Sequence, residues 1–107
     1  MWISGDTVLY DGVRTVADRL DVGVAILHLG EARFGLTGPV RYAMTINDGI
    51  ELCRALHLHT AIPVHYEGWS HFRQGRTAIE RVIAAAPHDV PTPFRLLPIG
   101  RSEEIDV

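Results

Sequence analysis

Short apolar runs alternate with amphipathic segments along the chain. Trp2 to Ser4 and Val22 to Leu29 are runs of apolar and small residues that favour β-strands. The second run is apolar almost throughout, which is typical of a strand covered on both faces. Thr60 to Tyr66 predicts a third strand. Because Pro63 within it cannot donate a ladder hydrogen bond, we expect this strand at a sheet edge or at a bulge.

Three other segments have the period of an amphipathic helix. Asp11 is positioned to cap the first helix, and Thr45 followed by Asp48 resembles a capping box that opens the second. The third helix is predicted from Arg76 to Ala86. The apolar stripes of the three helices are Val13, Val16, Ala17 and Leu20; Gly49, Leu52, Cys53 and Leu56; and Ile79, Val82, Ile83 and Ala86.

The remaining segments connect or end this pattern. Gly30 to Tyr42 is a predicted loop, Phe94 to Leu97 a last short strand, and Ser102 to Val107 a polar tail. No repeat, linker or low-complexity stretch interrupts the sequence. Residues 1–107 are therefore expected to form a single α/β domain.

Composition narrows the possible partners. The 107 residues carry a formal net charge of −3, which gives no electrostatic basis for binding nucleic acid or an anionic membrane. Hydrophobic residues make up 47% of the chain, an ordinary globular fraction. The single Cys53 excludes an internal disulfide and fits a reducing compartment. Without a leader pattern or an apolar run of the ~20 residues that span a bilayer, we expect a cytoplasmic protein.

Two side chains that can bind metal follow predicted strands. Asp6 comes after the first strand and Gly5, and His65 lies near the end of the third strand. A carboxylate and an imidazole from successive strand ends are a common basis for a hydrolytic Zn²⁺ site. Since the carboxyl ends of parallel strands lie at one edge of a sheet, we expect Asp6 and His65 to be close together. Two ligands leave the four-coordinate shell of zinc incomplete.

Other interpretations of these residues remain open. Asp6 could satisfy a turn through an Asx-type hydrogen bond, and His65 could be a half-buried core histidine. His71 could be a proton donor or substrate contact, or an exposed loop histidine. His28, within an apolar strand, is interpreted as a satisfied buried histidine. Glu67 is either a partner that orients His65 or a solvated loop carboxylate.

Several segments in series resemble the C-terminal half of a metallo-β-lactamase-fold hydrolase, with the ascorbate-6-phosphate lactonase-like proteins as the nearest subgroup. They are Ser4-Gly5-Asp6-Thr7, Leu27-His28-Leu29-Gly30, Met44-Thr45 and Pro63-Val64-His65-Tyr66-Glu67-Gly68-Trp69. The resemblance implies half of an αββα sandwich, with one mixed sheet and helices on one face. It also implies that Asp6 bridges two metal ions, zinc in this family, and that His65 binds one of them.

The sequence departs from the family pattern in its first metal motif. Neither H-x-H-x-D-H nor the further His that precedes the bridging Asp is present. His57 and His59 have H-x-H spacing, but no Asp-His follows them. The N-terminal half of the family fold is therefore expected to be missing from these residues.

Three functions follow as alternatives. The chain is the C-terminal portion of a metal-dependent hydrolase, with two zinc ions, that acts on a small-molecule lactone, ester or phosphoester. Its catalytic residues are then Asp6, His65 and His71. Alternatively, it is a non-catalytic half-domain that docks on a partner chain, such as a missing N-terminal half. In the third alternative, a homodimer replaces the missing layer with a second copy.

Overall fold

The sheet has three parallel strands. The computed structural model describes residues 1–70, 72–86 and 94–107. β1 (Trp2–Ile3), β2 (Val24–His28) and β3 (Thr60–Val64) lie in the order β1-β2-β3. Both strand pairs are parallel, which confirms the α/β class. The expectation of a mixed sheet is wrong for the described residues, because a helix returns the chain between successive strands and makes each pairing parallel.

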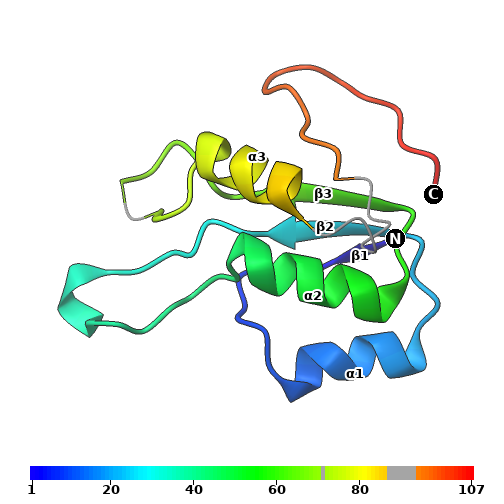
Figure 1. The fold of residues 1–107 in the computed structure, drawn as a ribbon, viewed down its shortest axis with the longest axis horizontal. Helices are drawn as coiled ribbons and strands as arrows, with labels where there is room; N and C mark the ends of the chain where they lie inside the picture. The colour runs from blue at the N-terminus through cyan, green and yellow to red at the C-terminus, as the bar shows by residue number, and fades with distance from the viewer. Residues whose placement is uncertain (71, 87–93) are drawn as a thin grey trace.

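Three helices cover one face of this sheet. They are α1 (Asp11–Arg19), α2 (Ile46–Leu56) and α3 (Arg76–Ala85), and a short 3₁₀ turn spans Gly35–Thr37. Figure 1 shows the helices as a layer in front of the strands, with α2 between α1 and α3, as expected for right-handed crossovers between neighbouring parallel strands. In the described part of the chain, no helix has the length and apolar character needed to cross a membrane.

The two predicted helix caps have different outcomes. The Thr45 hydroxyl accepts from the Asp48 N–H at 3.1 Å, and the Asp48 carboxylate accepts from the Thr45 N–H at 2.9 Å, which confirms the capping box. The prediction that Asp11 caps α1 is wrong. Tyr10 is the N-cap residue, without a side-chain capping bond, and Asp11 is the first helical residue, which pairs with Arg14 instead.

The position of β3 agrees with its proline. Pro63 lies opposite Leu27 in the ladder, and β3 is an outer strand of the three, so the expected edge position is confirmed. The predicted strand from Phe94 to Leu97 does not form. It is reduced to an isolated parallel bridge between Phe94 and Ala61, with one hydrogen bond of 2.8 Å from the Arg95 N–H to the Ala61 carbonyl.

The core lies between the sheet and the helices. Ala25, Leu27 and Ala61 belong to the buried cluster that includes the inner helix residues, such as Cys53, which is 1% exposed. Successive side chains of a strand point to opposite faces, so Ile26 and His28 lie on the face of β2 away from the helices. That face carries the register partners Ile3, Ile26 and Ile62, and it is unevenly covered, since Ile3 is 58% exposed and Ile62 only 2%. His28 therefore lies at the carboxyl end of the helix-free face.

Candidate functional site

The carboxyl ends of the strands bring Asp6 and His65 together. His65 Nδ1 lies 2.9 Å from Asp6 Oδ1, which confirms the predicted proximity. Asp6 follows Gly5, which has a left-handed backbone with a φ of +65°. His65 itself has a left-handed backbone, with a φ of +61°. These turns end the strands and expose the two side chains, by 59% for Asp6 and 36% for His65. The pair is open to a ligand.

Ser4 braces the turn that carries Asp6. Its N–H donates to the Ile26 carbonyl at 3.0 Å, which continues the β1–β2 ladder by one residue. Its hydroxyl accepts from the His28 N–H at 3.1 Å and donates to the Gly5 carbonyl at 3.0 Å. The hydroxyl therefore links the end of β2 to the left-handed turn at Gly5, and fixes the backbone from which Asp6 projects.

His28 belongs to the same cluster, which the interpretation of the sequence did not anticipate. Its ring centroid lies 5.3 Å from that of His65, and its Nδ1 lies 3.4 Å from Ser4 Oγ. Burial lowers the pKa of His28; the Asp6 carboxylate opposes this shift and His65 adds to it. The expectation of a satisfied buried histidine is correct only in part, since His28 is half-buried and hydrogen-bonded but adjoins the candidate site. Its place at the end of the central strand was the available signal.

Gly30, two residues after β2, allows a close approach of the His65 backbone. A Cβ atom at Gly30 would lie 2.2 Å from the His65 carbonyl oxygen and 2.6 Å from a ring carbon of Phe72. The Gly30 carbonyl also accepts from the N–H groups of Arg73 and Gln74 at 3.0 and 3.3 Å. The Phe72 ring in turn contacts the His65 ring, with centroids 4.6 Å apart. The position of His65 therefore depends on a glycine 35 residues earlier.

The other candidate residues are placed differently. His71, the predicted proton donor or substrate contact, lies outside the described residues. Glu67 is exposed, and the carboxylate that contacts His65 Nδ1 is that of Asp6. His57 is the C-cap of α2, and the His59 N–H donates to the Gly23 carbonyl before β2 begins. The H-x-H pair therefore lies at the amino end of the sheet, away from Asp6 and His65.

The donor chemistry fits zinc, but the set of ligands is incomplete. A carboxylate and an imidazole are both ordinary zinc ligands. Within the described ranges, no group of three or more His, Cys, Asp or Glu side chains is arranged to hold a metal ion. Asp6 and His65 could supply two ligands of a metal site. The remaining ligands would be water molecules, other residues, or side chains of this chain that move toward the ion.

A hollow of about 280 Å³ adjoins His65. It lies between the end of β3 and a later segment and is lined by Pro63, Val64, His65, Tyr66, Glu67, Leu97, Pro98 and Ile99. Apolar walls beside a polar cluster are typical of small-molecule sites. A small substrate in this hollow would be next to the His65 backbone and Glu67.

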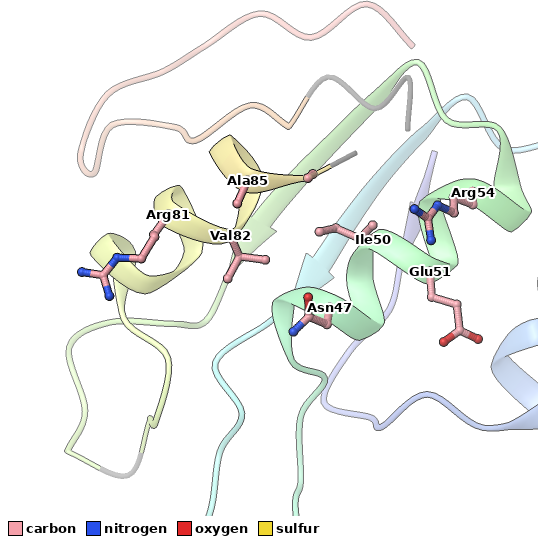
Figure 2. A pocket seen from close by; sticks show the side chains of 8 residues that line it. Asn47, Ile50, Glu51, Arg54, Arg81, Val82 and Ala85 are labelled. Carbon is pink, nitrogen blue, oxygen red and sulfur yellow. The ribbon is translucent and has the colours of Figure 1, made fainter. Parts of the chain in front are cut away.

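A larger hollow, of about 600 Å³, lies between α2 and α3. Figure 2 shows Ile50 of α2 and Val82 of α3 on its two sides. The residues that line it are Asn47, Ile50, Glu51, Arg54, Arg81, Val82, Ala85 and Ala86. Glu51, the only carboxylate in this lining, accepts hydrogen bonds of 3.2 and 3.0 Å from Arg14. This hollow contains no pairing of carboxylate with imidazole, so we place the chemistry at the strand ends.

Comparison with solved structures identifies two hydrolases with a similar fold. The chain is similar to an isothiocyanate hydrolase from Delia radicum gut bacteria, with a TM-score of 0.78 and 21% identity over 96% of this chain. It is also similar to Igni18, a metallo hydrolase from the hyperthermophilic archaeon Ignicoccus hospitalis KIN4/I, with a TM-score of 0.67 and 18% identity over 94%. The chain spans 38% and 39% of the lengths of these proteins. No protein-family model matches the sequence, and no curated protein is significantly similar to it.

Proposed function

We propose that this chain is the C-terminal portion of a metal-dependent hydrolase with a metallo-β-lactamase fold. The observation that carries the proposal is the 2.9 Å contact between Asp6 Oδ1 and His65 Nδ1 at the carboxyl edge of the sheet. The fold similarity to part of two hydrolases, one of them a metallo hydrolase, supports it. The nearest subgroup in this proposal is that of the ascorbate-6-phosphate lactonase-like proteins.

In this proposal Asp6 and His65 would hold zinc, with Asp6 as the ligand shared by two ions and His65 as a ligand of one of them. When bound, the metal pair lowers the pKa of a coordinated water to roughly 7 and polarises the group under attack. The chain itself contributes the ligands, the Ser4 brace that holds the Asp6 turn, and the hollow beside His65. His71 acts as a proton donor or substrate contact. The substrate is a small molecule with a carbonyl or phosphoryl centre, as in a lactone, ester or phosphoester.

We also propose a cytoplasmic location. Cys53 is the single cysteine of the chain, and its thiol is buried in the core. A single cysteine that is buried in the core fits a reducing compartment.

The test uses the protein encoded by the full reading frame that contains this chain. We expect it to hydrolyse at least one of three probes: p-nitrophenyl acetate, bis-p-nitrophenyl phosphate and a simple γ-lactone. Treatment with a chelator should abolish the activity, and added Zn²⁺ should restore it, because the proposed metal would supply the activated water. Hydrolysis that a chelator leaves unchanged would contradict the proposal, as would a pure protein that is inactive on all three probes with zinc present.

A second candidate function is association through an apolar arm. Residues 33–42, the middle of the loop between β2 and α2, project beyond the body of the molecule at the carboxyl end of β2 (Figure 1). They carry the exposed apolar side chains Phe34, Leu36, Val40 and Tyr42, of which Leu36 is fully exposed. Together with the exposed Ile3, these residues favour a half-domain that folds through homodimerisation or by docking on a partner chain.

Light scattering of the 107-residue chain at micromolar concentration tests this second candidate. We expect the mass of a dimer, because two-fold pairing is the commonest closed arrangement of identical chains. A substitution of Leu36 by Ser should shift the equilibrium toward the monomer if the arm is the contact. A monodisperse monomer for the unmodified chain would contradict homodimerisation.

A further inference from the structure

We propose that His28 is a further ligand of the cation site formed by Asp6 and His65. The inference rests on the proposed function and deepens it, since it adds a residue to the same site. Its ligand would be a borderline divalent cation, for which zinc is the natural representative, because imidazole and carboxylate donors suit that class. With His28 the chain contributes three donors, one from the end of each strand.

The sheet order places His28 between the other two residues. β2 is the central strand, with β1 on one side and β3 on the other. His28 is the last residue of β2 and pairs with Val64, the residue directly before His65. Ser4, two residues before Asp6, contacts the His28 backbone through its hydroxyl at 3.1 Å. The three side chains therefore project from adjacent positions along one edge.

The hydrogen bonds of Ser4 orient the His28 ring. A serine hydroxyl has one proton and two acceptor lone pairs. The Ser4 hydroxyl donates its proton to the Gly5 carbonyl at 3.0 Å, so the His28 Nδ1 at 3.4 Å is the donor in its contact with Ser4 Oγ. The lone pair of the neutral imidazole is then on Nε2, which makes no hydrogen bond within the described part of the chain. A fixed second ring nitrogen is the usual arrangement for a metal-bound histidine.

Cation binding requires one local adjustment. As the side chains stand, Asp6 Oδ1 contacts His65 Nδ1 directly, and the three residues do not surround a common point. The Asp6 and His65 side chains are 59% and 36% exposed, so they can rotate without displacing the core. Three protein ligands with one open position form the usual pattern of a hydrolytic zinc site. With His28 the chain would supply all three protein ligands of that pattern, whereas Asp6 and His65 alone supply two.

The test measures metal binding by the untagged 107-residue chain. Zn²⁺ affinity is measured by calorimetry, and Co²⁺ is added separately because its visible absorption reports the donor atoms around it. Two substitutions separate a ligand role from a structural role. His28→Asn keeps a nitrogen donor near the Ser4 hydroxyl and removes Nε2, whereas His28→Gln places an amide near the former Nε2 position. His57→Asn is the matched control, because His57 is a left-handed helix cap, where Asn is tolerated.

We expect saturable Zn²⁺ binding that weakens at least tenfold in His28→Asn, since even loss of an outer-shell partner costs roughly 10- to 100-fold in metal affinity. The Co²⁺ spectrum should change in the same variant and remain unchanged in His57→Asn. Asp6→Asn and His65→Asn should weaken binding as well. If these two weaken binding and His28→Asn does not, the inference is overturned while the proposed function stands. Binding lost only in His57→Asn, or no saturable binding at all, would also overturn it.

Discussion

In the protein encoded by the full reading frame, replacing Asp6 with asparagine is expected to abolish hydrolysis. The substitution keeps the size of the side chain and removes the negative charge that would hold the metal ions in the proposed site. The loss should exceed the 10²–10⁴-fold that a general acid–base group contributes, because the proposed site would lose the metal that activates the nucleophile. Initial rates on the activated ester or phosphoester, together with zinc content by elemental analysis, measure the effect.

The matched control is Asp11→Asn. Asp11 is a fully exposed aspartate on α1 that pairs with Arg14 and is not part of the Asp6–His65 pair, and its replacement should leave the rate and the zinc content unchanged. His65→Asn should resemble Asp6→Asn, and Asn tolerates the left-handed backbone at this position. His71→Ala should have a smaller effect, on the order of 10²–10⁴-fold. Full activity of Asp6→Asn would place the chemistry elsewhere.

A methyl group at Gly30 is expected to destabilise the chain and displace His65. The added Cβ would lie 2.2 Å from the His65 carbonyl oxygen, a backbone atom that cannot move away as a flexible side chain does. Overpacking of this kind typically costs about 1–3 kcal/mol of the free energy of unfolding. Urea denaturation of Gly30→Ala measures the loss. Because His65 is displaced, Zn²⁺ affinity should fall in the same variant.

Gly35→Ala provides the control for this prediction. No atom lies within 4 Å of a Cβ placed at Gly35, and its backbone has no positive φ. The free energy of unfolding should therefore remain within about 0.5 kcal/mol of the unmodified chain, as for most surface substitutions. Equal stability of Gly30→Ala and Gly35→Ala would show that the close approach of Gly30 to the His65 backbone does not constrain the site.

Features that depend on residues close together in the sequence were easier to predict than those that depend on a distant partner. The Thr45–Asp48 capping box forms because both of its hydrogen bonds join residues three apart. The cap of α1 was mispredicted because Asp11 has two local options, capping the helix or entering it, and the ion pair with Arg14 is compatible with the second. The strand expected at Phe94 depends on a distant partner, and only one residue of that segment pairs with Ala61.

The candidate site was predictable as far as parallel topology determines it. Asp6 and His65 follow successive strands, and the carboxyl ends of such strands meet at one edge. His28 was not anticipated as part of the site. Its place in an apolar strand indicates burial, but the sequence does not show that the ring of this last strand residue lies beside that of His65. The role of Gly30 was also hidden, since its close contact comes from the segment around His65, far along the sequence.

The most direct test of the proposed metal site is anomalous diffraction at the zinc absorption edge. Crystals of the protein encoded by the full reading frame, grown with Zn²⁺, would be measured above and below the edge. We expect an anomalous peak about 2.0–2.2 Å from a carboxylate oxygen of Asp6 and a ring nitrogen of His65. An anomalous peak bound only by other residues, with Asp6 and His65 still in direct contact, would contradict the assignment of these two residues as metal ligands.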